Sequence, residues 1–271
     1  MTNFSWELKQ EKVLNNGKVY LVGAGPGAAD LLTLRAARVL EQAEVLLYDR
    51  LVSEEILDMV GKGARRVYVG KELAANSQLR QERIYALMIG HAREGRRVVR
   101  LKGGDPYVFG RGSEEMLELV AAGIEAEVVP GISSCISAPG QAHIPVTHRG
   151  LAASFGVFTG HPGDGVRAVA VDWIAAARIG TAVFLMGVSK LPEIVERLGT
   201  HGRSADTPVA LIEQATRPGQ KVVTGTLADI LSKSHSVRSP TTIVVGEVVG
   251  VGTHIAEMKN AQAAALFENV S

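Results

Sequence analysis

The sequence predicts an α/β protein with two domains, because two different patterns of secondary-structure signal divide the chain. In the first half, continuous apolar runs alternate with segments of helical period, a pattern typical of a mostly parallel sheet covered on both faces. After about residue 150 the strand-like runs are more closely spaced, which favours a second, partly antiparallel α/β domain. At 271 residues the chain is long enough for two medium-sized domains.

The first predicted domain spans 17–148, after a polar extension at 1–16. Its helices include 32–43, where apolar side chains recur on one helical face, and 114–122, which ends at Gly123, a common helix stop. Its strands are expected at 18–23, 44–48, 66–70, 97–101 and 126–130.

The second predicted domain spans 149–252, and the boundary lies in the polar segment 143–154. A helix is expected at 190–198, and the tail at 253–271 could form an exposed terminal helix. Strand-like runs lie at 155–159, 182–186, 208–213, 220–224 and 241–249.

Composition excludes several classes of protein. Hydrophobic residues make up 46% of the chain and the net charge is +1, so nothing favours non-specific binding to nucleic acid or to an anionic membrane. No apolar run approaches the ~18 residues of a transmembrane helix, and no signal sequence is recognised. The single cysteine, Cys135, excludes a cysteine-rich metal site and favours a cytoplasmic location. His148 has no second ligand at useful spacing, so no metal is expected.

Two glycine-rich loops follow predicted strands. In residues 98–115 an apolar run breaks into Gly103, Gly104 and Asp105, and a similar loop lies at 23–27. Strands that end in glycine and an acid commonly form ligand sites, because bare backbone can approach a ligand closely. Two such loops in one α/β chain predict a cofactor cleft with more than one wall.

The loop at 23–27 differs from a dinucleotide fingerprint. Ala28 stands where that pattern has its third glycine, which alone would be tolerated. Pro26, however, removes a backbone N–H that a pyrophosphate would use. The residues alone leave open whether this turn contacts a ligand or is structural.

Polar side chains follow three further strands. Asp49 and Arg50 come directly after one, Lys71 after the next, and Ser133 and Ser134 after a third. At the carboxyl end of parallel strands such groups usually face a ligand crevice. The alternatives are helix capping, a surface ion pair or, for the lysine, simple solvation.

Nine motifs occur along the chain: GAGPG, YDRLV, VGK, RLKGGDPYVFGRG, VVPGISS, PVTHRG, VFTGH, FLMG and TTIVVGEVV. Together they resemble those of the tetrapyrrole methylases that use S-adenosyl-L-methionine. They stand in family order and spacing from about residue 17 to 250, and within the family they are most similar to those of the uroporphyrinogen-III C-methyltransferases. The chain departs from the pattern at Ala28 and Ala29, where the family usually has an acid and a proline.

The resemblance implies two α/β domains with the cofactor in the cleft between them, and a homodimer. It implies Asp49 as proton acceptor and Lys71 as proton donor, with Arg111 as a further catalytic residue. Substrate would be bound by Arg50, Arg111, Glu114 and Arg149. The cofactor would be surrounded by Pro26, Gly103, Gly104, Asp105, Val108, Ser133, Ser134, Met186 and Ala215.

The implied reaction methylates uroporphyrinogen III at C-2 and then C-7, gives precorrin-2 through precorrin-1, and releases S-adenosyl-L-homocysteine. The electron-rich pyrrole is the nucleophile, and arginines suit its carboxylates because they pair bidentately. For Arg111 we favour charge stabilisation over a role as base, given its high pKa. The sirohaem, cobalamin and haem d₁ routes remain open.

Three other functions are weighed. Another member of the family, such as a later precorrin methylase or the diphthamide-forming methylase, is the first. An NAD-binding oxidoreductase is the second, since Asp49 lies at about the spacing of a ribose-binding acid. The third, a non-catalytic binding module, is disfavoured by the many polar residues at strand ends.

Overall fold

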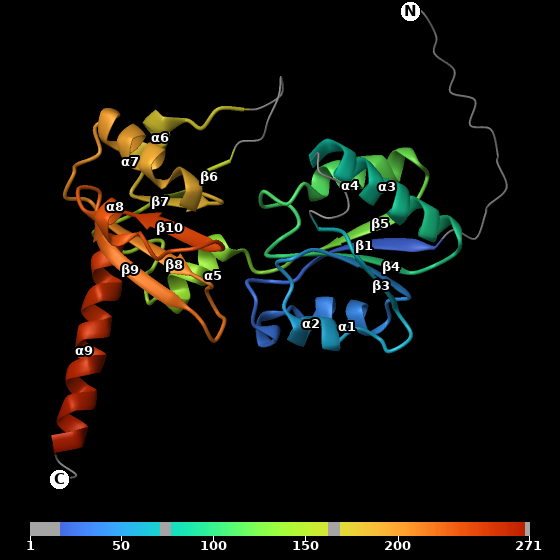
Figure 1. Ribbon diagram of the computed structural model, residues 1–271, viewed down its shortest axis with the longest axis horizontal. Helices are drawn as coiled ribbons and strands as arrows, with labels where there is room; N and C mark the ends of the chain where they lie inside the picture. Colours follow the sequence, from blue (N-terminus) through green and yellow to red (C-terminus); the bar gives the residue numbers. More distant parts are fainter. Residues whose placement is uncertain (1–16, 71–76, 162–168, 269–271) are drawn as a thin grey trace, which may run out of the picture.

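A computed structural model describes residues 17–70, 77–161 and 169–268, which form two five-stranded sheets in two lobes (Figure 1). The strands of the first sheet run in the order β3-β2-β4-β1-β5, and every pair is parallel. They are β1 (Lys18–Gly23), β2 (Val45–Tyr48), β3 (Arg65–Tyr68), β4 (Val98–Lys102) and β5 (Glu125–Val129). All five predicted strands are confirmed, with ends that differ by at most two residues.

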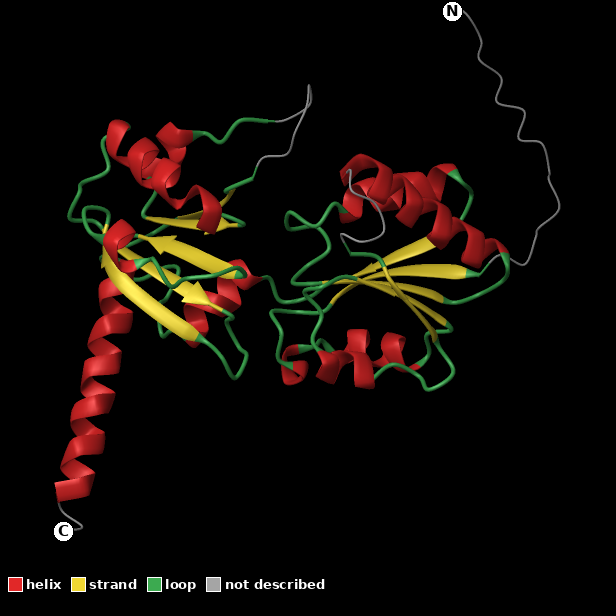
Figure 2. Ribbon diagram, in the orientation of Figure 1, coloured by secondary structure: helices red, strands yellow, loops and turns green. Residues whose placement is uncertain are grey.

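Helices cover both faces of this sheet, which explains the continuous apolar strands (Figure 2). On one face, α1 (Leu34–Glu41) and α2 (Glu54–Asp58) bury Leu40 and Ile56 against Leu46. On the other, α3 (Ser77–Arg93) and α4 (Gly112–Ala121) bury Met88 and Leu119 against Leu47. Leu46 and Leu47 serve opposite faces because successive strand residues alternate. A short 3₁₀ turn, η1 (Ala29–Leu31), precedes α1.

The second sheet is mixed, as its closely spaced strands predict. The order is β6-β7-β10-β8-β9, and β6 pairs with β7 in parallel while the remaining pairs are antiparallel. The strands are β6 (Phe155–Thr159), β7 (Thr181–Leu185), β8 (Pro208–Glu213), β9 (Lys221–Thr226) and β10 (Thr241–Val245).

Phe184 is central to one face of this sheet, where it lies among apolar side chains of α6 (Trp173–Arg178), α7 (Leu191–Thr200) and α8 (Ile230–Lys233). A 3₁₀ turn, η3 (Val188–Lys190), leads into α7. The other face is covered by α5 (Ser134–Gln141) and the first turn of α9 (Val248–Glu268). Helix α5 therefore packs on the second sheet although it precedes residue 149, so the division at 148 and 149 remains a proposal.

The prediction of a strand over 241–249 is wrong at its carboxyl end. The strand stops at Val245, Gly246 takes φ +151°, and α9 begins at Val248. Val248 and Val249 are buried as the first turn of a helix, and a short apolar run does not distinguish that from a strand. The predicted terminal helix is present and begins earlier than expected. Beyond Gly252 it is mostly exposed as far as Gln262 and projects from the lobe (Figure 1).

Candidate functional site between the two sheets

The loops after β1, β4 and β5 pack backbone against backbone at the edge of the first sheet that faces the second. Gly25 N donates to Gly104 O at 3.1 Å, and Gly104 N donates to Gly25 O at 2.7 Å. Gly131 N, after β5, donates to the Asp105 carboxylate at 3.1 Å. A Cβ on Gly131 would lie 2.3 Å from Gly104 O, so this contact requires glycine. Both glycine loops predicted from the sequence thus belong to one site.

Gly104 has room for a Cβ without a clash. Its φ is +68°, and the nearest atoms to a Cβ built there would be Ser133 Cα at 3.9 Å and Ser134 N at 4.0 Å. Ser133 Oγ accepts from Cys135 N at 3.4 Å, so this serine does cap α5. The structure brings together six of the predicted cofactor positions on three neighbouring loops: Pro26, Gly103, Gly104, Asp105, Ser133 and Ser134.

The remaining predicted cofactor positions lie at the second sheet. Val108 and Ala215 both pack against the buried cluster that includes Leu185 and Ile212. Met186 follows β7 with φ +56° and is 52% exposed. The loop after β4 therefore reaches the second sheet, and it carries Val108 to the same cluster as Ala215.

Two hydrogen bonds connect the loop after β8 to loops of the first lobe. Ala28 N donates to Thr216 Oγ1 at 3.1 Å, and Arg217 Nη2 donates to Leu51 O at 2.5 Å. Arg217 lies against Gly27, where a Cβ would come 2.6 Å from its Nε. Sequence reasoning missed Thr216 and Arg217, because a polar loop offers no spacing signal for a contact with a distant segment.

Two of the three predicted catalytic positions, Asp49 and Arg111, lie within the described residues, and each contacts a charged side chain. Asp49 follows β2; its carboxylate accepts from Leu51 N at 3.1 Å and lies 3.4 Å from Arg100 Nη2. Arg111 precedes α4 at φ +57° and pairs bidentately with Glu114, at 3.0 and 2.7 Å. Hydrogen bonding to Glu114 raises the pKa of Arg111, and the same pair lowers the pKa of Glu114. Lys71 lies outside the described residues.

Arg50 and Arg149 are exposed in their loops. Among the described residues neither forms an ion pair, which leaves both guanidinium groups available to an anionic ligand.

A buried charged cluster beside Asp49 was not predicted. Arg100 Nε and Lys102 Nζ lie 3.2 and 2.9 Å from Oε1 of Glu115, and Gln81 donates to the same oxygen at 3.0 Å. Burial and Arg100 lower the pKa of Lys102 to about 8, although Glu115 opposes this. Burial acts to raise the pKa of Glu115, but Arg100 and Lys102 outweigh it and the pKa is lowered. Charged residues at alternate positions of an apolar strand were the available signal.

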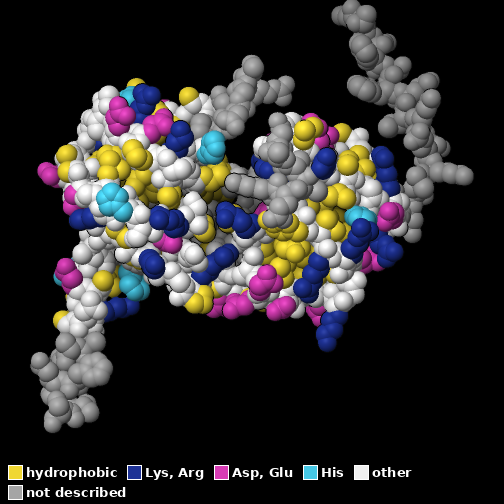
Figure 3. Space-filling model, in the orientation of Figure 1, with side chains coloured by type: hydrophobic (Ala, Val, Ile, Leu, Met, Phe, Trp, Pro, Cys, Tyr) yellow, Lys and Arg dark blue, Asp and Glu magenta, His cyan; other side chains and the backbone are white. Residues whose placement is uncertain are grey.

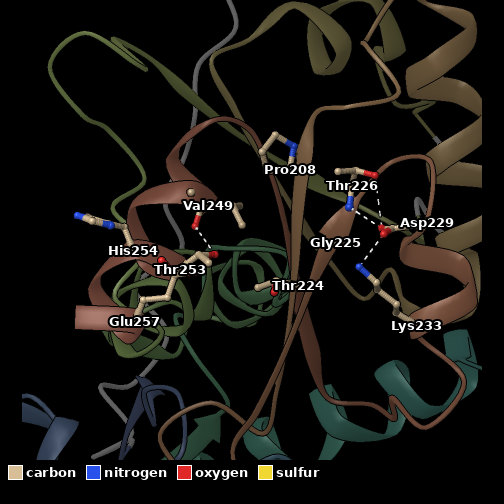
Figure 4. A pocket seen from close by; sticks show the side chains of 11 residues that line it. Pro208, Thr224, Gly225, Thr226, Asp229, Lys233, Val249, Thr253, His254 and Glu257 are labelled. Carbon is tan, nitrogen blue, oxygen red and sulfur yellow. Dashed lines mark hydrogen bonds and ion pairs between the residues drawn. The ribbon is translucent and has the colours of Figure 1, made fainter. Parts of the chain in front are cut away.

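Two surface cavities lie outside these loops. One, of about 360 Å³, lies between β9, α8 and α9 at the amino end of β8, where Asp229 already pairs with Lys233 and Thr226 (Figure 4). The other, of about 390 Å³, lies between the end of β6 and α7. It includes Gly160, whose Cβ would lie 2.3 Å from Gly187 Cα, so it adjoins Met186.

The space-filling view places Lys and Arg side chains on both lobes around the region where they meet, without a large patch of one charge (Figure 3). The described residues contain no group of three or more His, Cys, Asp or Glu side chains placed to hold a metal ion. No helix within 17–70, 77–161 and 169–268 has both the length and the apolar character needed to cross a membrane.

Residues 18–231 match the family model described as Tetrapyrrole (Corrin/Porphyrin) Methylases. The chain is 49% identical over 255 residues to a siroheme synthase of Pseudomonas fluorescens and 49% identical over 249 residues to one of Pseudomonas aeruginosa. These matches cover 93% and 91% of the chain. The chain spans about half the length of these relatives, 54% and 53%.

Solved structures are similar over most of the chain. The uroporphyrin-III C-methyl transferase from Thermus thermophilus complexed with S-adenosyl homocysteine has a TM-score of 0.74 at 42% identity, over 86% of this chain and 93% of that one. A cobalamin biosynthetic enzyme, cobalt precorrin-4 methyltransferase, has a TM-score of 0.73 at 28% identity, over 86% and 95%.

Proposed function

The chain belongs to the tetrapyrrole methylase family, and we propose that it methylates uroporphyrinogen III at C-2 and then C-7, with S-adenosyl-L-methionine as donor. The products are precorrin-2, by way of precorrin-1, and S-adenosyl-L-homocysteine. One observation carries the proposal: the loop after β4 packs against the glycine loops after β1 and β5, brings Val108 to the second sheet and leads to the Arg111–Glu114 pair. Identity of 42% to a uroporphyrin-III enzyme, against 28% to a precorrin-4 enzyme, supports the choice of substrate.

The site fits the proposed donor. A Cβ at Gly104 would meet no atom closer than 3.9 Å, the Ser134 backbone N–H lies nearby, and the Asp105 carboxylate accepts from Gly131 N on the neighbouring loop. In this proposal Met186 and Ala215 contact the donor from the second sheet, and Pro26 and Val108 contact it from the loops after β1 and β4. When bound, S-adenosyl-L-methionine supplies an electrophilic methyl group. The chain's part is to hold that group in line with the ring carbon, since positioning alone can supply a large share of the acceleration.

The substrate carries eight carboxylates, and the chain meets them with local arginines. Arg50 and Arg149 have no carboxylate partner among the described residues, and Arg111 is fixed by Glu114. The raised pKa of Arg111 keeps it protonated, which suits stabilisation of charge rather than removal of a proton. Asp49 is the proposed proton acceptor. Lys71 is the proposed donor, and this assignment rests on its place in the sequence.

Finer proposals concern assembly and pathway. We expect a homodimer, to be measured by light scattering of the purified protein. The product would feed sirohaem, cobalamin or haem d₁ synthesis, and complementation of strains blocked in each route distinguishes these. A cytoplasmic location rests on the low cysteine content and is tested by cell fractionation.

The decisive experiment combines binding and turnover. Calorimetry should show affinity for S-adenosyl-L-homocysteine and none for NAD, and anaerobic incubation with uroporphyrinogen III and donor should add the mass of two methyl groups. Methylation of a later precorrin in place of uroporphyrinogen III would move the chain to another branch of the family. Failure to bind the demethylated donor product would refute the proposal itself.

A further inference from the structure

The charged cluster formed by Arg100, Lys102 and Glu115 connects the elements to which the proposed chemistry is assigned. Arg100 contacts both Glu115 and Asp49. Glu115 directly follows Glu114, the partner of Arg111, in the first turn of α4. Lys102 is the last residue of β4 and directly precedes Gly103. The cluster therefore touches the β2 loop, the glycine loop after β4 and the start of α4.

Stability does not account for this cluster. Glu115 is fully buried, Arg100 and Lys102 are 4% and 5% exposed, and Glu115 Oε2 has no hydrogen-bond partner among the described residues. Replacing buried ion pairs by apolar side chains of similar volume is often neutral or stabilising. Strand β4 supplies Val98 on this same face, so an apolar alternative fits the pattern of the sheet. Perturbed, buried charges beside a cleft are typical of functional sites.

We propose that Arg100, Lys102 and Glu115 are positioning residues, which hold the Asp49 carboxylate in a fixed place relative to Arg111 and Glu114. The inference rests on the proposed function. Arg100 is central because its planar guanidinium bonds Glu115 through Nε and reaches Asp49 through Nη2, so one rigid group sets the separation of the two carboxylates. Lys102 and Gln81 fix Glu115 in turn, since both donate to the oxygen that Arg100 uses.

The proposed role requires a protonated Lys102, so turnover should depend on pH. The charged groups that face Lys102 are Arg100 on β4, Asp49 after β2, and Glu115 and Glu114 on α4; α3 contributes the neutral Gln81. Burial and Arg100 lower the pKa of Lys102 to about 8, and Glu115 raises it. We therefore expect turnover to fall as pH rises past this value. This fall is the alkaline limb of the pH profile of turnover. Removing the Glu115 charge should move the limb to lower pH, because Glu115 raises the pKa of Lys102.

The test is Glu115→Gln, which keeps the volume, with Glu118→Gln on the exposed face of the same helix as matched control. We expect kcat to fall at least about tenfold, a loss of transition-state alignment. The dissociation constant for S-adenosyl-L-homocysteine should change less than about twofold, because the Glu115 side chain bonds Arg100, Lys102 and Gln81, none of which is a proposed cofactor position. The alkaline limb should shift to lower pH. Glu118→Gln should match the wild type in all three. Arg100→Lys, which keeps the charge but not the fork, should lose turnover similarly.

The double variant Glu115→Gln/Lys102→Met removes one charge of each sign and serves as a control for unfolding as the cause of lost turnover. It should bind S-adenosyl-L-homocysteine normally and remain slow, and recovery of wild-type turnover would overturn the positioning role. Wild-type turnover and an unmoved limb in Glu115→Gln would overturn it as well. These results presuppose an active wild type, so a wild type that transfers no methyl group counts against the proposed function instead.

Discussion

Replacing Gly104 by alanine should weaken cofactor binding by more than it destabilises the fold. The residue has φ +68°, and a Cβ there meets no atom closer than 3.9 Å. Backbone strain therefore sets the loss of stability, about 1–2 kcal/mol for a left-handed non-glycine residue. The new methyl group occupies the space proposed for the donor. We expect at least about tenfold weaker binding of S-adenosyl-L-homocysteine, equivalent to about 1.4 kcal/mol.

Gly123→Ala provides a matched control. Gly123 has φ +71° and no atom within 4 Å of the position that a Cβ would take, so its strain is the same, yet it follows the end of α4 rather than a loop of the site. Both variants should lose similar stability in urea titrations, and only Gly104→Ala should lose affinity in calorimetry. Equal affinity losses in the two variants, or none in Gly104→Ala, would contradict the placement of the donor.

Three further predictions concern charged residues. Arg111→Lys should keep affinity for S-adenosyl-L-homocysteine yet lose most turnover, because lysine cannot form the bidentate pair with Glu114; wild-type turnover would refute this. Arg217→Ala should weaken the same affinity about fivefold by removing the hydrogen bond to Leu51 O, as calorimetry would show; unchanged affinity would argue against closure by this loop. For Lys102, whose folded pKa of about 8 lies below its unfolded value, the unfolded state binds more protons between pH 8 and 10.5. The penalty for burying the charged Lys102 is present below pH 8 and is relieved as pH rises. The stability of the wild type relative to Lys102→Met should therefore increase between about pH 7 and about pH 9.5 in urea titrations. A difference in stability that stays flat or falls would contradict this prediction.

Most strands were predictable because each is a short β-branched run between turn residues. The first sheet is buried on both faces, so its strands read as continuous apolar segments. The error at 241–249 has the same origin. Val248 and Val249 are as apolar as a strand, and only the packing of α9 under the sheet shows that they belong to a helix.

The packing of the candidate site was predictable where it is made of loops that follow strands. Gly104 and Asp105 stand out because glycine and an acid interrupt an apolar run, and the structure joins their loop to that of Pro26. Arg217 could not be found in this way, since its contact with Leu51 joins residues 166 positions apart. The charged cluster was missed for a different reason: Lys102 ends an apolar run, and the burial of its side chain depends on α3 and α4, which the run itself does not reveal.

Backbone strain is concentrated in the loops that follow three strands. Five of the six non-glycine residues with positive φ among those described lie in these loops: Phe109 and Arg111 after β4, Met186 after β7, and Gln214 and Thr216 after β8. Such residues cost about 1–3 kcal/mol each and persist where surrounding structure enforces them. Glycine would relieve the strain at every one of these positions. Two of these residues, Arg111 and Met186, hold positions proposed for substrate and donor, so the strain is concentrated in loops to which the proposed chemistry is assigned.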